Sequence, residues 1–301
     1  MPAVPVIYRQ ALTGDRLRHY GPWAKYVPLP LLQRVGNRLP EKALWQAAIP
    51  CGELTAELSV VGVPRGGALL QAGPEREQLP TVLSHNLMVE RRNRVAGRSL
   101  ALGMLRRMLP GLAKQLELFG DRLSIGLAVA EWERAFWVLG LEPYARSITV
   151  LLKENEKVRT LGQTGIAVRP ASYGSGKADA HLLIVSPECV PEVSRLALRQ
   201  GTLLISANGL AVEPFLGCLS LDLGLPEQLG LPPVIWADSS DQFPVLETVL
   251  IAAFLTGKLT DWPVNMSRRI NLMDRIFAWS QWPIAYHLVS EGNARAGGEL
   301  D

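Results

Sequence analysis

The run Leu123-Ser-Ile-Gly-Leu-Ala-Val129 passes directly into a helical pattern over 130–140, and a second apolar run, Ile148-Thr-Val-Leu-Leu152, follows it. Further short apolar runs lie at 166–168, 181–186, 202–206 and 219–223. Continuous apolar runs that alternate with helical patterns are typical of parallel strands buried on both faces by helices. The stretch therefore predicts an α/β fold with a doubly wound parallel sheet.

The residues before this stretch predict a smaller α+β domain. Prolines cut residues 1–80 into short pieces, which excludes long helices there. A β-hairpin is predicted over 53–70 around Pro64-Arg-Gly-Gly67, because the glycines can supply the positive φ of a turn. Apolar residues at helical spacing predict a helical region over 81–119, which Gly120-Asp121 ends.

Helical patterns also follow the apolar runs. They predict a helix over 191–200 and C-terminal helices over 245–255 and 267–279, whereas 291–301 has the composition of a frayed tail. By analogy with two-domain proteins of this order, we expect the C-terminal helices to pack on the first domain. The chain is thus predicted to comprise a first domain over 1–119, a sheet domain over 120–257, and C-terminal helices with a tail over 258–301.

The composition excludes several classes of protein. Hydrophobic residues make up 48% and charged residues 20%, which is typical of a globular protein with ample core. A net charge of +3 gives no reason to expect a nucleic-acid partner. The three cysteines and four histidines are scattered, so neither a disulfide framework nor a metal site is expected.

The N-terminus and the apolar segments of the sequence indicate where in the cell the protein would be found. The N-terminus lacks the pattern of a signal peptide, and no apolar window is long enough to span a bilayer. We therefore expect a cytoplasmic protein without a membrane partner. The eight tryptophans and the apolar C-terminal region would suit either burial between domains or a homodimer surface.

Ligands of an open parallel sheet bind beyond the carboxyl ends of its strands. The candidate binding residues are those at the ends of the apolar runs: Gly126, Ala128, Lys153, Glu154, Ser186, Pro187 and Asn208.

Several segments carry a resemblance to a known family. They are Ser124-Ile-Gly-Leu-Ala-Val-Ala, Ile148-Thr-Val-Leu-Leu-Lys-Glu-Asn-Glu-Lys-Val, Ala178-Asp-Ala-His-Leu-Leu-Ile-Val-Ser-Pro, Gly201-Thr-Leu-Leu-Ile-Ser-Ala-Asn and Leu221-Asp-Leu-Gly-Leu-Pro. In this order they resemble the NAD(P)-binding domain of Rossmann-type dehydrogenases of the shikimate dehydrogenase-like arrangement, over about 121–255. The resemblance implies a Rossmann-like nucleotide domain over 120–257, a substrate domain over 1–119, NAD or NADP as cofactor, and a small polar substrate in an interdomain cleft.

The phosphate-binding loop departs from the G-x-G-x-x-G pattern of such domains. Its three glycine positions correspond to Gly126, Ala128 and Glu131. A glutamate in the first helical turn suits the helix dipole but repels a phosphate there. Either the cofactor sits differently, or this is an inherited turn that binds none.

The remaining binding candidates each have two readings. Glu154 would accept a hydrogen bond from a ribose 2′-hydroxyl and favours NAD, whereas Lys153 could bind a 2′-phosphate and favours NADP. The resemblance places Ser186-Pro187 beside the nicotinamide ribose, although the same dipeptide also suits a helix N-terminus. Asn208 would lie on the nicotinamide side or simply form a turn.

The catalytic residues are the least determined. The resemblance implies a lysine and aspartate pair that no segment matches. The candidates are Lys25, His85 at the head of the helical region, and Asp238 after an apolar run, and each also suits a purely structural role.

The leading hypothesis is thus an NAD(P)-dependent dehydrogenase. The alternative is a non-catalytic ligand-binding or protein-interaction protein on a degenerate Rossmann fold. A methyltransferase that binds S-adenosylmethionine is a third option, and it matches the order of the strands less well.

Overall fold

The computed structural model describes residues 4–36, 38–51, 54–64, 81–83, 97–115, 123–152, 167–175, 177–207, 218–224, 242–255, 266–280, 284–290 and 293–300. Its contacts divide the chain into two compact units. The first comprises Met1–Gly97, Glu227–Val264 and Arg275–Gln281, and the second comprises Arg98–Pro226, Asn265–Asp274 and Trp282–Asp301. Both units are therefore built from segments that lie far apart in the sequence.

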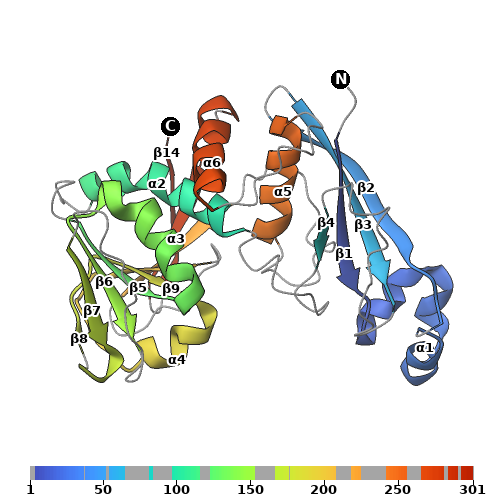
Figure 1. Ribbon diagram of the computed structural model, residues 1–301. Helices are drawn as coiled ribbons and strands as arrows, with labels where there is room; N and C mark the ends of the chain where they lie inside the picture. The colour runs from blue at the N-terminus through green and yellow to red at the C-terminus, as the bar shows by residue number, and fades with distance from the viewer. Residues whose placement is uncertain are drawn as a thin grey trace. The chain divides into compact units, whose positions relative to one another are not determined.

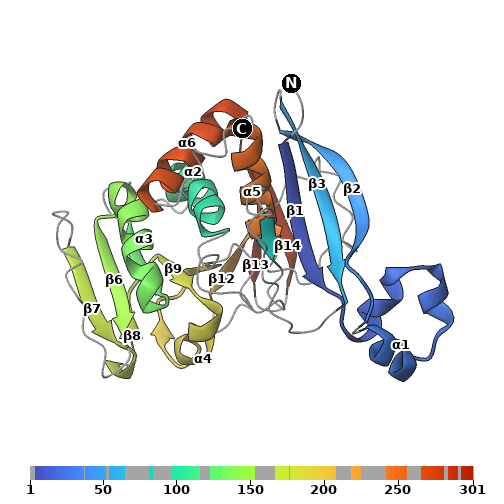
Figure 2. The same cartoon turned by 45° about the vertical axis from the view of Figure 1, so that its right-hand side comes forward.

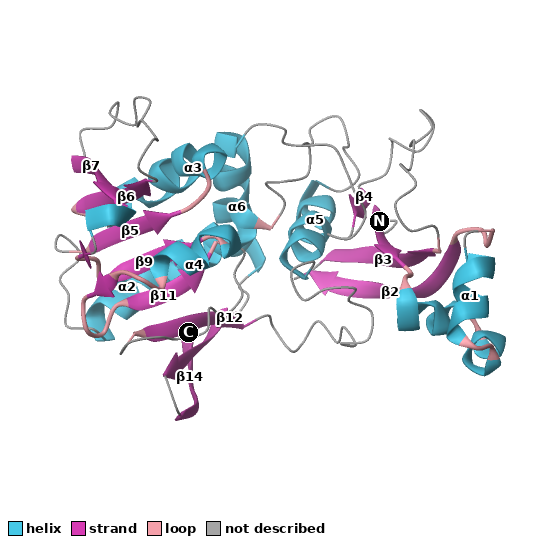
Figure 3. Cartoon of the chain, turned by 90° about the horizontal axis from the view of Figure 1, so that it is seen from below, coloured by secondary structure: helices cyan, strands magenta, loops and turns pink. Residues whose placement is uncertain are grey.

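The second unit contains an eight-stranded sheet with the order β14-β13-β12-β11-β9-β5-β6-β7, which can be followed from below in Figure 3. Its parallel strands are β5 (Ser124–Ala128), β6 (Ser147–Leu152), β7 (Ala167–Ser172), β9 (Leu182–Val185), β11 (Leu203–Ser206) and β12 (Leu219–Gly224). Strands β13 (Ile284–Ser290) and β14 (Asn293–Leu300) continue the sheet antiparallel beside β12. The predicted α/β class with a doubly wound parallel sheet is confirmed.

The order of the parallel strands identifies the topology. In chain order they lie as third, second, first, fourth, fifth and sixth, which is the order of the Rossmann fold. Strands β9 and β11 are buried at every position, as expected of central strands covered by helices on both faces. The strand order reverses between β5 and β9, and this is the switch point of the sheet.

Helices flank this sheet (Figure 1). Helix α2 (Arg98–Gln115) packs on α3 (Glu131–Leu141), which connects β5 to β6. After β9 come the short η8 (Pro187–Cys189) and α4 (Val190–Val193), and the two-residue strands β8 (Lys177–Ala178) and β10 (Ala197–Leu198) pair beside the main sheet. Trp137 of α3 is completely buried and stacks edge-on with Phe136 at 5.5 Å between ring centroids.

The first unit contains a four-stranded sheet with the order β2-β3-β1-β4. Strands β1 (Val4–Ala11), β3 (Leu54–Val63) and β4 (Thr81–Leu83) are parallel, and β2 (Lys42–Cys51) pairs antiparallel with β3. Helix α5 (Gln242–Leu255) packs on β1, β3 and β4 and is apolar and buried along most of its length. The expectation that a C-terminal helix returns to the first part of the chain holds for α5.

A small helical segment completes the first unit. It consists of η1 (Gly14–Tyr20), η2 (Pro22–Tyr26) and α1 (Leu29–Gly36). The remaining helix, α6 (Met266–Ser280), contributes residues up to Asp274 to the second unit and the rest to the first. Among the helices in the described ranges, none is both long and apolar enough to cross a bilayer.

Some predicted elements differ from the structure. Residues Thr81–Leu83, predicted as the start of a helical region, form β4, because they pair with β1. The antiparallel partner of β3 is β2, which precedes it, whereas the hairpin predicted around Pro64-Arg-Gly-Gly67 extends outside the described residues. Local periodicity does not reveal such distant pairing.

Three further corrections concern the second unit. The helix predicted over 191–200 ends at Val193, because Ala197–Leu198 pair with Lys177–Ala178 as strand β10 instead of continuing the helix. The predicted frayed tail forms β14, because main-chain pairing with β13 needs no apolar side chains. Helix α2, which precedes the predicted boundary at Gly120, groups with the large sheet.

Candidate functional site

The candidate site lies at the switch point, where the carboxyl ends of β5 and β9 meet. Ala128, the last residue of β5, is in register with Val185, the last residue of β9. The Ser186 amide donates to the Ala128 carbonyl at 2.9 Å and joins the two strands just beyond their ends. In open α/β sheets this crevice receives the ligand.

The turn from β5 to α3 consists of Val129 and Ala130, and Ala130 is the N-cap of the helix. With the turn in this place, the three glycine positions of a dinucleotide loop correspond to Ala128, Ala130 and Glu133. This corrects by two residues the positions inferred from the sequence, Gly126, Ala128 and Glu131. An apolar run does not reveal at which residue its strand ends.

Gly126 lies in the middle of β5, and close packing explains it. A Cβ built there would lie 2.6 Å from Leu183 Cδ1 and 3.2 Å from Ala180 Cβ, closer than side-chain atoms normally approach. Leu183 is the register partner of Gly126 on β9. The glycine therefore makes room for the Leu183 side chain on the face of the sheet.

A buried carboxylate dominates the polar chemistry of the switch point. The Glu133 side chain is completely buried, and its Oε2 accepts a hydrogen bond from the Ser186 hydroxyl. Its Oε1 accepts from Arg98 Nε at 2.7 Å, and this ion pair is itself largely buried. Glu131, which the sequence suggested would oppose a phosphate, is exposed. Arg98 therefore offsets the charge of Glu133 but not that of Glu131.

A second polar group lies at the same edge of the sheet. Tyr173 follows β7, Cys189 belongs to η8, Glu192 to α4 and Arg134 to the first turn of α3. Burial raises the pKa of the Tyr173 hydroxyl above its ordinary value; the Cys189 thiol and the Glu192 carboxylate act in the same direction, and the Arg134 guanidinium opposes them. Tyr173 therefore stays a neutral hydroxyl that can donate a hydrogen bond.

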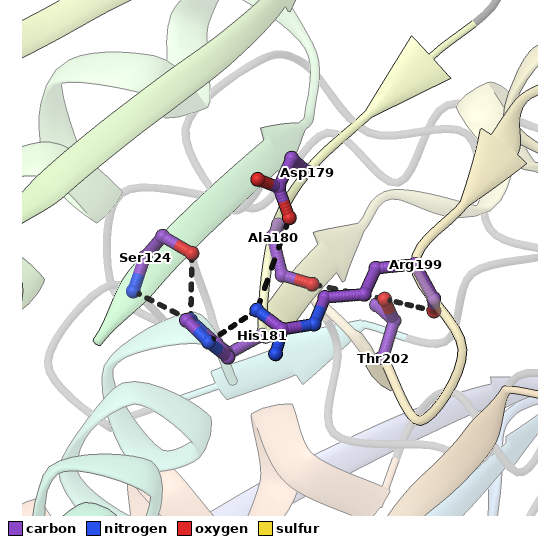
Figure 4. Close-up of polar contacts among 6 residues, drawn as sticks. All are labelled: Ser124, Asp179, Ala180, His181, Arg199 and Thr202. Carbon is purple, nitrogen blue, oxygen red and sulfur yellow. Dashed lines mark hydrogen bonds and ion pairs between the residues drawn. The ribbon is translucent and has the colours of Figure 1, made fainter. Parts of the chain in front are cut away.

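A third polar cluster lies at the opposite, amino end of the strands, and Figure 4 shows its side chains. His181 Nδ1 accepts from the Ser124 amide at 3.1 Å and lies 2.7 Å from the Ser124 hydroxyl, while Nε2 lies 2.7 Å from Arg199 Nη1. Burial lowers the pKa of His181, the Arg199 charge lowers it further, and Asp179 opposes both. This cluster ties the starts of β5 and β9 together, away from the ligand edge.

The structure places the predicted site residues in different parts of the chain. Ser186 and Pro187 lie at the switch point, with Ser186 buried and Pro187 exposed at the start of η8. Lys25 lies exposed on η2, which belongs to the other unit. The remaining predicted site residues, His85, Lys153, Glu154, Asn208 and Asp238, lie outside the described residues and stay predictions.

The sequence analysis predicted Ser186 but missed its partner Glu133 and the Arg98 that pairs with Glu133. Glu133 and Arg98 are 35 residues apart, and Ser186 is 53 residues from Glu133. No local spacing pattern links them. The available signal was an acidic residue three positions into the helix that follows the first strand. Among the residues that the structure describes, no three His, Cys, Asp or Glu side chains gather in a way that could hold a metal ion.

Comparison with known proteins does not identify a family. No family model matches the chain, and no curated protein matches its sequence. Among solved structures, the chain is similar to the crystal structure of L-tryptophan dehydrogenase from Nostoc punctiforme, with a TM-score of 0.34 and 8% sequence identity over 92% of this chain and 80% of that chain. A likeness at this level carries no argument about activity, and the fold assignment rests on the strand order.

The switch point meets some of the requirements of a nicotinamide dinucleotide and lacks others. The strand order provides the crevice in which such cofactors bind. Arg98 offsets the charge of Glu133, whereas Glu131 adds an exposed acidic side chain to the same helical turn. Ala128 and Ala130 are small, although each carries a Cβ where glycine would let the phosphate approach closer. The switch point therefore fits the cofactor in topology, and departs from the usual glycine pattern.

Proposed function

We propose that this protein is an NAD(P)-dependent dehydrogenase that acts on a small polar substrate. The observation that carries the proposal is the strand order of the large sheet, with its switch point between β5 and β9. A dinucleotide would lie across this crevice, beyond Ala128 and Ser186. When bound, the nicotinamide would supply or accept the hydride.

The residues of the switch point would position the cofactor. Ser186 is held by Glu133, so its hydroxyl has a fixed orientation at the end of β9. Arg98 holds the Glu133 side chain in place through its ion pair. In this proposal Lys153 or Glu154 would read the adenosine ribose, and Asn208 would border the nicotinamide. The catalytic candidates remain His85, Lys25 and Asp238.

A second candidate function is a non-catalytic ligand-binding or protein-interaction role on the same fold. The observation that favours it is Glu133, a buried carboxylate at the position where a dinucleotide loop has its third glycine. That glycine normally allows close packing of the helix on the sheet. In this protein the position carries an ion pair between Glu133 and Arg98. This ion pair can stabilise the fold whether or not a cofactor binds.

Ligand-induced stabilisation separates the two candidates. Thermal unfolding of the whole protein should be followed with NAD, NADP, NADH and NADPH at millimolar concentration. A ligand at about 100 times its Kd stabilises by about 2.7 kcal/mol. That corresponds to a rise in Tm of roughly 5–10 °C. No shift with any of the four would reject the dehydrogenase proposal and leave the second candidate.

The same measurement tests the position of the adenosine ribose. If NADP alone raises the Tm, Lys153→Glu should transfer the preference to NAD, because a carboxylate accepts hydrogen bonds from the 2′-hydroxyl and repels a 2′-phosphate. An unchanged preference would show that the ribose lies elsewhere.

A further inference from the structure

The helical corner formed by residues 14–36 has an apolar interior of its own. Its buried side chains form a small cluster with the end of β1: Leu12, Leu17, Tyr20, Ala24 and Leu32. Lys42 Nζ donates to the Tyr20 carbonyl at 2.7 Å and fixes the corner to β2. Figure 2 shows α1 and the short helices before it at one end of the small sheet. The corner is thus held together by its buried side chains and by its hydrogen bond to β2.

The corner also exposes large apolar side chains. Trp23, Tyr26, Leu31 and Val35 are 44%, 87%, 51% and 45% exposed, whereas in the rest of the described chain the same holds for Leu139 alone. Trp23 and Tyr26 are three residues apart on a 3₁₀ helix, where such side chains eclipse one another. Leu31 and Val35 are four apart on α1, so they share a face. Each of the two helices therefore turns an apolar pair toward solvent.

The corner also carries the positive charge of the protein. Its residues include Arg16, Arg18, Lys25 and Arg34 and a single acidic residue, Asp15, which gives +3. The whole chain has 31 basic and 28 acidic residues and the same net charge, so the rest of the chain sums to zero. Arg18, Lys25 and Arg34 are exposed, and they belong to the same short helical segment as the exposed apolar side chains. The net charge of the whole chain does not show that the excess of basic residues is concentrated in residues 14–36.

Charge and side-chain type together narrow the choice of partner. A symmetric contact with a second copy would place two surfaces of +3 against each other. A nucleic acid would stack on Trp23 and Tyr26 but has no use for Leu31 and Val35. A stable protein interface uses about 20–30 residues on each side, more than this face offers. Aromatic and aliphatic side chains among basic residues suit an anionic membrane surface, where they enter the headgroup region while the cations face the lipid phosphates.

We propose that the helical corner 14–36 docks the protein peripherally on membranes rich in anionic lipid. Trp23, Tyr26, Leu31 and Val35 enter the interface, and Arg18, Lys25 and Arg34 pair with the headgroups. The sequence predicted no membrane partner, because neither the search for spanning segments nor the total charge reveals a local basic and apolar surface. The proposal requires no cofactor and no particular activity.

Sedimentation with vesicles tests this in the whole protein. Vesicles of phosphatidylcholine alone should leave the protein in solution, whereas vesicles containing phosphatidylglycerol should sediment it, and high salt should release it. Each basic residue near an anionic surface contributes about fivefold to binding. Arg18→Gln with Arg34→Gln should therefore weaken binding about 25-fold. Trp23→Ser with Leu31→Ser should weaken it by roughly tenfold or more, because buried apolar area is lost.

Matched substitutions outside the corner serve as controls. Leu139→Ser removes an apolar side chain of similar exposure (49%), and Arg195→Gln removes an exposed cation from the second unit. Both should bind vesicles as the wild type does, and all variants should keep the circular dichroism spectrum of the wild type. Absence of binding to phosphatidylglycerol vesicles would overturn the proposal. So would equal loss in the control variants, or binding to single-stranded RNA or to an acidic protein with none to vesicles.

Discussion

At the scale of single residues, the Glu133 carboxylate shows how this chain differs from a glycine-rich dinucleotide loop. It is buried in the first turn of α3 and held by groups from two other segments, Arg98 and Ser186. A buried carboxylate is tolerated only when its charge and its lone pairs are both satisfied. The three residues therefore act as a unit that fixes α2, α3 and β9 to one another.

Removal of this charge should be costly. Glu133→Gln keeps the size of the side chain but leaves the Arg98 guanidinium without its anion. Breaking a buried pair costs about 3–5 kcal/mol, and we expect the lower end because Arg98 retains some contact with solvent. Denaturant unfolding measures the change. Glu131→Gln, in the same helical turn but exposed, should change stability by less than about 0.5 kcal/mol. Equal effects of the two substitutions would contradict this account.

A substitution at Gly126 shows whether this position is glycine because of packing against Leu183 or because a cofactor approaches it. Gly126→Ala places a Cβ against Leu183 and should destabilise by about 1–3 kcal/mol through overpacking. In a Leu183→Ala background the same substitution should cost much less, because the space is then open. A double-mutant cycle of unfolding free energies measures this coupling. Additive effects would show that Leu183 is not the reason for the glycine.

His181 makes stability depend on pH. Its folded-state pKa is lowered, first by burial and then by Arg199, so the unfolded chain binds the proton more tightly. Stability is therefore complete above the unfolded pKa of about 6.5 and falls as pH drops below it, until the folded pKa is reached. The free energy of unfolding should decrease between pH 7.5 and pH 5 by more in the wild type than in His181→Asn. Parallel curves for the two proteins would exclude His181 as the cause.

At the scale of elements, the start of α5 closely approaches the turn at Gly97. The Gly97 amide donates to Glu247 Oε2 at 2.7 Å, and its φ of 87° lies in the left-handed region. A Cβ there would lie 2.8 Å from the Pro244 nitrogen, which is backbone and cannot move away cheaply. The position requires glycine for its conformation and for its contact with the helix.

Substitutions at Gly97 and Gly14 separate the effect of positive φ from the effect of close packing. Gly97→Ala should destabilise the protein by about 2–4 kcal/mol, from backbone strain and the clash with Pro244 together. Gly14 also has positive φ (56°), but the space around its Cβ is open. Gly14→Ala should therefore cost only about 1 kcal/mol. The two values come from denaturant unfolding, and a larger loss for Gly14→Ala would refute the packing argument.

Some of the strands could be predicted from the sequence and others could not. The runs at 123–129, 148–152 and 202–206 formed strands as predicted, because a buried parallel strand is marked by its own apolar residues. Elements that depend on distant partners were missed: β4 exists through β1, and β14 through β13. The edge of the sheet that carries the site followed from topology. The ion pair between Arg98 and Glu133 did not, because it joins residues whose distance in sequence bears no relation to any local period.

At the scale of the whole molecule, the chain does not divide into consecutive domains. The first unit closes its small sheet with α5, although in the sequence all six parallel strands of the second unit lie between β4 and α5. Ten residues of α5 are buried, most of them apolar. Without this helix, the sheet formed by β1, β3 and β4 would expose an apolar face to water.

Residues 1–97 expressed alone should therefore fail to fold cooperatively, although they contain every strand of the small sheet. Joining residues 242–255 to their C-terminus through a flexible Gly/Ser linker should restore a cooperative transition, because the helix again covers the sheet and the linker adds only a small entropic cost. Near-ultraviolet circular dichroism and thermal unfolding distinguish the two fragments. A control in which Val245, Leu246 and Val249 of the added segment are replaced by serine should behave like residues 1–97. Cooperative unfolding of residues 1–97 without the helix would show that α5 is dispensable, and that the first unit is a domain of consecutive residues after all.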